Sequence, residues 1–276
     1  MNILIRELRS NAKPLVIWSL VVILFNVAGV MKFEGIAGGD PQSVRQLTEA
    51  FPKVALAVMG ISDLDMTTFA GYYAVLMFYV GIMAAVYAVA LAAHAVSREM
   101  MDGTYEFLFV RPVSRTAILT WKLVAALIDA VIFTVVDLVS ALLCLPMLDG
   151  LSDASGSAMV VIRFAIWMLA MMLVFGALAA CACAACLGSE HGLERGSLIG
   201  NSAVVVAYCA GVAYDMFSDH DASVVVRVLS PFRYAIPQDV IDGQVPMPFA
   251  ILGVVIVVVC FAASYIAFLR RDLTSR

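Results

Sequence analysis

Two carboxylates and one carboxamide lie inside long apolar segments of the chain, where polar side chains are rare. Asp129 and Asp137 fall within the apolar run from 117 to 148, and Asn26 falls within the run from 14 to 31. On a helix, a spacing of eight residues separates the two carboxylates by about 80° around the axis and ~12 Å along it. A carboxylate at membrane depth is costly unless it is paired or hydrated, so we expect both to face the protein interior. They either form a polar site for a cation or a proton, or they hydrogen-bond to a neighbouring helix.

The cysteines are the second group that could do chemistry. Of six, Cys181, Cys183 and Cys186 are close together in an apolar segment that contains no His or carboxylate. Buried thiols of this kind behave as small hydrophobic side chains. We therefore expect packing here, with metal or redox chemistry as the alternative, and we assign no metal site.

Catalytic motifs are missing from the sequence. It contains no G-x-x-x-x-G-K-[ST], no H-E-x-x-H and no Rossmann glycine pattern, and it suggests no serine or cysteine triad. The expectation is a protein that is not an enzyme, with no catalytic residue, no cofactor of its own and no capacity to hydrolyse ATP.

The composition places these residues in a membrane protein. Hydrophobic residues make up 63% of the 276 residues and charged residues 14%, with a mean hydropathy of +0.98. A soluble domain is about half apolar and a quarter charged, so membrane lipid must cover part of this surface. The net charge of -4 argues against a nucleic-acid partner, which requires a basic face.

Six apolar segments are long enough to cross the ~30 Å hydrocarbon core. None alternates as a strand does, and a spanning segment must be a helix or part of a closed barrel. The predicted fold class is therefore all-α integral membrane, a six-transmembrane-helix bundle in a single domain over 1–276. The predicted spans are 14–31, 69–96, 117–148, 158–187, 197–217 and 247–269.

The distribution of charge orients the bundle. Lys and Arg are more frequent in the loops on the side of the N-terminus, and acidic residues are more frequent on the other side. The positive-inside rule then predicts that both termini are cytoplasmic. The charged start MNILIRELRSNAKP resembles no cleavable signal, and it is expected to form an amphipathic helix before the first span.

Two outer loops carry apolar residues. In the loop 32–68, Val44, Leu47, Phe51, Val54 and Val58 recur at three- and four-residue spacing, which predicts one short interfacial helix. In the loop 218–246, the run 224–229 is too short to span and is expected to enter the outer leaflet.

The cytoplasmic loop between the second and third spans is the most informative segment. Gly103 permits a bend, and Pro112 ends any helix before the next span. Residues 107–110 form an apolar patch in a water-facing loop, which indicates a partner surface. The candidate docking residues are Arg98, Glu99, Asp102, Gly103, Thr104, Glu106, Phe107, Leu108, Arg111, Pro112, Ser114 and Arg115. A shorter cytoplasmic turn, 188–196, carries Glu190, His191, Glu194 and Arg195.

The segment SREMMDGTYEFLFVRPVSRTAILTWKLVAA resembles the cytoplasmic loop of bacterial ABC type-2 exporter permeases. The residues that match this family's pattern are Glu99, Gly103, Thr104, Glu106, Leu108, Pro112, Ser114, Arg115 and Lys122. Three further segments are similar to the family in order and spacing: RELRSNAKPLVIWSL to its elbow helix, LSPFRYAIPQDVIDGQ to its S-P-F segment, and FLRRDL to its usual ending.

The resemblance implies a permease subunit of an ATP-binding-cassette exporter in the bacterial cytoplasmic membrane. Two permeases, identical or different, would assemble with two separate ATPase subunits that bind ATP and Mg. A coupling helix in the loop 98–115 would dock on the ATPase, the turn 188–196 would be a second contact, and the first, second and fifth spans would line the substrate path. Two alternatives remain: a proton- or sodium-coupled secondary transporter that uses Asp129 and Asp137, and a non-transporting membrane scaffold or sensor. The substrate stays open.

Overall fold

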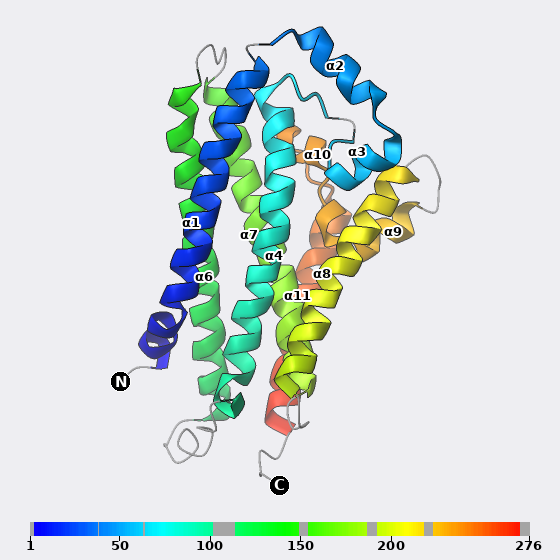
Figure 1. Cartoon of the computed structure of the whole chain (residues 1–276). Coiled ribbons are helices and arrows are strands. Elements are labelled where there is room, and N and C mark those ends of the chain that lie inside the picture. Colours follow the sequence, from blue (N-terminus) through cyan, green and yellow to red (C-terminus); the bar gives the residue numbers. More distant parts are fainter. Residues whose placement is uncertain are drawn as a thin grey trace.

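The computed structural model describes residues 3–37, 39–62, 64–101, 114–148, 154–186, 192–217 and 223–270. Six long helices run the length of the molecule (Figure 1). They are α1 (Ile3–Ala37), α4 (Phe69–Met101), α6 (Arg115–Cys144), α7 (Ala154–Cys186), α8 (Gly192–Met216) and α11 (Met247–Arg270). The prediction of an all-α bundle with six apolar helices long enough to span a membrane is confirmed.

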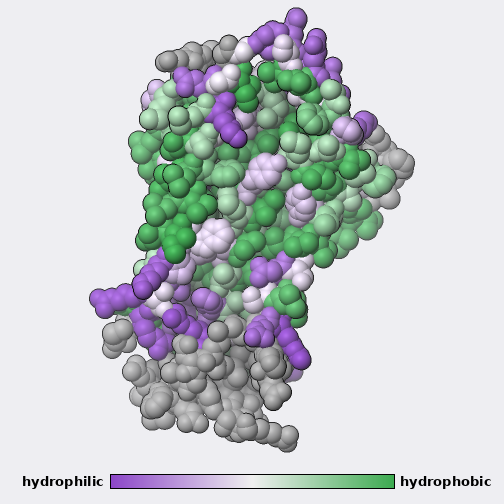
Figure 2. All heavy atoms as spheres, viewed as in Figure 1, coloured by the Kyte–Doolittle hydropathy of each residue, from purple (hydrophilic) through white to green (hydrophobic). Residues whose placement is uncertain are grey.

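The long helices exceed the thickness of the hydrocarbon core. The 33 residues of α4 extend about 50 Å at ~1.5 Å per residue, so its ends reach the headgroup regions. Figure 2 shows hydrophobic residues over the middle of the viewed face and hydrophilic residues gathered at its two ends. This pattern is that of a helix bundle whose outside contacts lipid.

The central helix of the bundle is α4. In its most apolar stretch 72% of residues are buried, against 6% for α11, which lies at the outside. Met77, Val80, Ala84 and Tyr87 of α4 belong to one core cluster with Phe133 of α6. Most of the apolar surface of α11 therefore has no protein contact within this chain.

The first helix begins earlier than the predicted span. Residues 3–13, expected to be a separate amphipathic helix, are continuous with the span in α1, and Pro14 lies inside the helix. Proline removes one backbone hydrogen bond and bends the helix at this point. In Figure 1 the ribbon of α1 changes direction near its N-terminal end. The amphipathic segment is thus the first part of a bent α1.

The loop after α1, which is predicted to be an outer loop, forms two short helices, where a single one was predicted. They are α2 (Pro41–Ala50) and α3 (Lys53–Met59), separated at Phe51 and Pro52, whose backbone is extended. Pro52 has no N–H to continue the helix and disfavours helical geometry at the residue before it. The apolar spacing across this stretch was correctly identified, but the prediction of one helix was wrong.

Side-chain contacts hold this outer segment in place. Asp40 caps α2 by accepting hydrogen bonds from the backbone N–H groups of Gln42 and Ser43, both at 3.2 Å. The hydroxyl of Ser43 and these N–H groups keep the pKa of Asp40 below its usual value. Hydrogen bonds from Thr67, chiefly from its hydroxyl, lower the pKa of Asp65 in the same way. Both carboxylates are therefore charged at neutral pH.

Two tyrosines attach α3 to the spans. The hydroxyl of Tyr208 in α8 donates to the carbonyl of Val58 at 2.9 Å, and that of Tyr79 in α4 donates to Met59 at 3.0 Å. The last carbonyls of a helix have no partner within it, so these bonds cap α3. The outer segment is thereby fixed across α4 and α8.

The second outer segment contains three short elements. They are α9 (Ser223–Leu229), the 3-10 turn η2 (Pro231–Arg233) and α10 (Pro237–Asp242). A second 3-10 turn, η1 (Leu145–Met147), ends the third span. With seven residues, α9 is too short to span a membrane, in keeping with the expectation for 224–229.

Candidate functional site

The predicted docking loop lies between the end of α4 and the start of α6. Arg98 is in the last turn of α4 and Arg115 is the first residue of α6, and both side chains are partly buried. The hydroxyl of Ser114 caps α6 by accepting from the N–H of Ala117 at 3.2 Å. The remaining predicted docking positions lie outside the described residues: the side chain of Glu99, and Asp102, Gly103, Thr104, Glu106, Phe107, Leu108, Arg111 and Pro112.

The second predicted contact lies at the same end of the bundle. Glu194 and Arg195 are exposed in the first turn of α8, whereas Glu190 and His191 lie outside the described residues. In Figure 1 the end of α4, the start of α6 and the start of α8 lie at the end that also holds both chain termini. The described flanks of the two predicted docking segments are therefore at the same end of the bundle.

Lys122 links the helices that flank the docking loop. Its side chain is 2% exposed, and its ammonium donates to the carbonyl of Ala95 in α4 at 2.9 Å. Nearby, the hydroxyls of Thr120 in α6 and Tyr265 in α11 are 2.7 Å apart. The start of α6 is therefore bonded to both α4 and α11.

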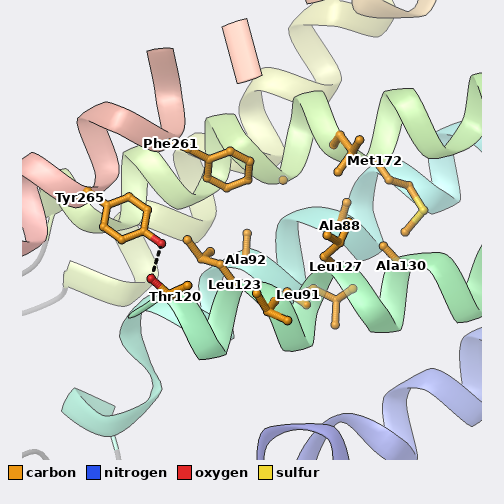
Figure 3. A pocket seen from close by; sticks show the side chains of 14 residues that line it. Ala88, Leu91, Ala92, Thr120, Leu123, Leu127, Ala130, Met172, Phe261 and Tyr265 are labelled. Carbon is orange, nitrogen blue, oxygen red and sulfur yellow. Dashed lines mark hydrogen bonds between the residues drawn. The ribbon is translucent and has the colours of Figure 1, made fainter. Parts of the chain in front are cut away.

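A groove opens beside these contacts. It has a volume of about 300 Å³ and is almost wholly apolar, with Leu91, Leu123, Met172 and Phe261 among its lining residues. Figure 3 shows side chains from α4, α6, α7 and α11 converging on it, with the bonded hydroxyls of Thr120 and Tyr265 at one end. Such a surface fits hydrocarbon and offers little to a polar ligand.

The two carboxylates of the third span both face α1. The amide of Asn11 donates to Asp129 Oδ2 at 2.7 Å, and the amide of Asn26 donates to Asp137 Oδ1 at 3.0 Å and to Ser140 Oγ at 2.8 Å. Asp129 is 1% exposed and Asp137 is fully buried. The expected interior orientation is observed, and the structure brings Asn26 and Asp137 together while Asp129 pairs elsewhere.

Sequence reasoning missed Asn11 as a partner of Asp129. The residue lies in the charged N-terminal segment and was read only as part of an amphipathic helix. Glu7 and Asn11 are four residues apart on α1, and both are buried at 4% and 6% exposure. The four-residue spacing of these two polar residues places them on one face of a helix, but nothing in the sequence relates that face to Asp129.

The S-P-F segment folds back into the bundle between α7 and α8. The hydroxyl of Ser230 donates to the carbonyl of Ala207 in α8 at 2.7 Å. The ring of Phe232 lies 5.1 Å from that of Phe175 in α7, and both are buried. Arg233 forms a buried ion pair with Asp215 of α8. The sequence had placed Arg233 among the outer loop charges, so its burial is a correction.

Arg163 lies toward the outer end of α7 and donates to the carbonyl of Ile241 in α10. This bond connects α7 to the segment that follows the S-P-F motif. A second apolar groove of about 500 Å³ lies between α7, α11 and this segment.

The three clustered cysteines lie on α7. Cys183 is buried, and Cys181 and Cys186 are partly buried. Within the part of the chain that the structure describes, no three His, Cys, Asp or Glu side chains gather as metal ligands. Cys183 packs closely against Gly196 of α8.

The comparisons with known proteins identify the family. A family model described as "ABC-2 family transporter protein" matches residues 1–191, which include the first four spans and the docking loop. A search of curated proteins found no significant match. The matched region contains α1, α4, α6 and α7, the helices that carry the buried polar pairs and the flanks of the loop. The chain therefore belongs to the ABC-2 family and is a multi-pass membrane permease of an ABC transporter.

Proposed function

We propose that this chain is the permease subunit of an exporter whose ATPase is a separate polypeptide. The observation that carries the proposal is the common location of the two cytoplasmic segments at one end of the bundle. Each segment joins two long helices, so a protein bound there contacts the ends of α4, α6, α7 and α8. Two permeases and two ATPases would form the complex, in the bacterial cytoplasmic membrane with both termini cytoplasmic.

The mechanism follows from the helices that flank the loop. When the ATPases bind ATP and Mg and close, the 98–115 loops would move with them. Because Lys122 bonds the α4 backbone, and Thr120 contacts Tyr265 of α11, the displacement of α6 would move α4 and α11 as well. A cavity between the two permeases would thereby change from inward-open to outward-open.

The second permease would dock on the face formed by α1, α4 and α8. In Figure 1, α1 and α8 flank α4 on the viewed side. Large apolar side chains are exposed on both flanking helices, including Ile17 and Leu24 on α1 and Leu198 and Val205 on α8. A two-fold dimer across this face would place the substrate path along α4, and it can form from two identical or two different chains.

The secondary-transporter alternative is less well supported. In a secondary transporter, Asp129 and Asp137 would both bind the coupling ion along one transport pathway. Each carboxylate instead bonds a different asparagine of α1. The scaffold alternative shares the docking surface and differs only in the absence of transport.

The docking proposal is tested by purifying the tagged chain from its native membrane and identifying co-purified proteins. We expect an ABC ATPase with the native chain and its loss when Phe107→Ala and Arg111→Ala are combined. Arg45→Ala is the matched control, because Arg45 lies on α2 at the opposite end of the bundle.

This control should retain the ATPase. Recovery of the chain without any ATPase, or equal recovery of the ATPase with the loop variant, would contradict docking at this loop.

A further inference from the structure

Three buried polar atoms without hydrogen-bond partners come from the neighbouring helices α1, α4 and α6. They are Asn26 Oδ1, Asp137 Oδ2 and the Tyr73 hydroxyl, three of the seven such atoms in the part of the chain that the structure describes. Asn26 and Asp137 are in direct contact, and Tyr73 is on α4, which packs against both α1 and α6. Tyr73 is 2% exposed, Asn26 1% and Asp137 0%.

The hydrogen bonds that Asn26 and Asp137 already form show which of their atoms still lack a partner. Asn26 uses both amide hydrogens, toward Asp137 Oδ1 at 3.0 Å and Ser140 Oγ at 2.8 Å. The two remaining atoms, Asn26 Oδ1 and Asp137 Oδ2, are both acceptors when the carboxyl is ionised. Two buried acceptors with no donor between them each lose their hydrogen bonds to water without replacement, which is unfavourable.

No basic side chain compensates a negative charge here. Among the described residues, no Lys, Arg or His nitrogen lies within 4.0 Å of the Asp137 carboxyl. The titratable groups around it are Tyr73 from α4 and, further along α6, Cys144, which also interacts with Tyr73. An isolated buried carboxylate is expensive, and such a group becomes neutral or binds a cation.

We propose that Asp137 is a carboxylic acid and that this cluster is a proton-binding site. A proton on Oδ2 turns that acceptor into a donor toward Asn26 Oδ1. Acid and amide then exchange two hydrogen bonds, one in each direction, and both unpartnered atoms gain a partner.

The bound proton would join α1 to α6 without a buried charge. The Asn11–Asp129 bond is a second junction between these helices. The junctions are 15 residues apart on α1 and eight apart on α6, or about 22 Å and 12 Å of helix. The two junctions occur in the same order along both helices, Asn11 with Asp129 and Asn26 with Asp137. With both formed, α1 and α6 would move as one unit.

The test is infrared spectroscopy of the purified full chain in lipid nanodiscs. A protonated carboxyl has a C=O stretch in a region free of amide bands, and this band shifts in D₂O. We expect such a band at neutral pH, its loss in Asp137→Asn, and its retention in Asp129→Asn and Tyr73→Phe. Asparagine at 137 can still bond both atoms of Asn26, so this variant should fold.

Labelling the native chain with ¹³C-aspartate gives the answer if Asp137→Asn does not fold. The band should move to lower frequency with labelled aspartate and stay in place with labelled glutamate, and it should do so in Asp129→Asn as well. Absence of any aspartic acid band would overturn the proposal. A rise in melting temperature with NaCl but not choline chloride, lost in Asp137→Asn, would also overturn it, because it would identify a sodium site.

Discussion

Replacing Arg233 by alanine should destabilise the protein by about 3–5 kcal/mol. The Arg233 and Asp215 side chains are 3% and 7% exposed and form a direct ion pair. Removal of one partner leaves an uncompensated buried charge, whose cost exceeds the energy gained by forming the pair. The loss should appear as a large drop in the melting temperature of the purified chain in detergent, and as poor recovery from membranes.

The matched control is the exposed pair Arg45–Asp65. Its side chains are 63% and 40% exposed and their atoms are 2.7 Å apart. Solvent screens such a pair, so Arg45→Ala should change stability by about 0–1 kcal/mol. The double change Arg233→Met with Asp215→Leu removes both charges and should recover much of the stability lost in Arg233→Ala. Equal melting temperatures for Arg233→Ala and Arg45→Ala would contradict the buried pair.

Replacing Gly196 by alanine should separate α7 and α8 at the docking end of the molecule. A Cβ at Gly196 would lie 2.7 Å from both the Cα and the Sγ of Cys183. Because one of these neighbours is backbone, relief requires a shift of a whole helix. Forced overpacking of this kind costs about 1–3 kcal/mol. We expect a lower melting temperature and, because the turn 188–196 is displaced, weaker ATPase co-purification.

Gly35→Ala in α1 is the control for the general effect of glycine replacement. A Cβ at Gly35 would have no atom within 4 Å. Alanine is favoured over glycine inside a helix by about 0.5–1 kcal/mol, so this variant should be as stable as the native chain or slightly more stable. If Gly196→Ala behaved like Gly35→Ala, the close crossing of α7 and α8 would be wrong.

The spans were predictable because the tendency of a segment to span the membrane depends on its own residues and little on distant parts of the chain. A run of about 20 apolar residues must be a helix whatever its neighbours are. The interior orientation of Asp129 and Asp137 was predictable for a similar reason, since a carboxylate avoids lipid from any position.

What could not be predicted from the sequence depends on contacts between distant segments. Arg233 resembles any loop arginine until the S-P-F segment is seen to fold against Asp215, 18 residues earlier in the chain. Asn11 and Asp129 are 118 residues apart, and no local spacing relates them. The break between α2 and α3 is different, because Pro52 was visible in the sequence and predicts the end of a helix.

The docking residues of the loop remain a prediction. Its flanks are described, with Ser114 capping α6 and Lys122 bonded to α4, but the motif from Asp102 to Pro112 lies outside the described residues. Support for its role comes from the family resemblance of its residues and from its described flanks, the end of α4 and the start of α6, which lie at the same end of the bundle as the start of α8.

The most direct test of the central claim is the ATP hydrolysis rate of the purified partner ATPase, measured with and without this chain in lipid nanodiscs. The account predicts that the native chain changes this rate, and that the Phe107→Ala, Arg111→Ala variant does not. An ATPase rate that is the same with and without the native chain would contradict it.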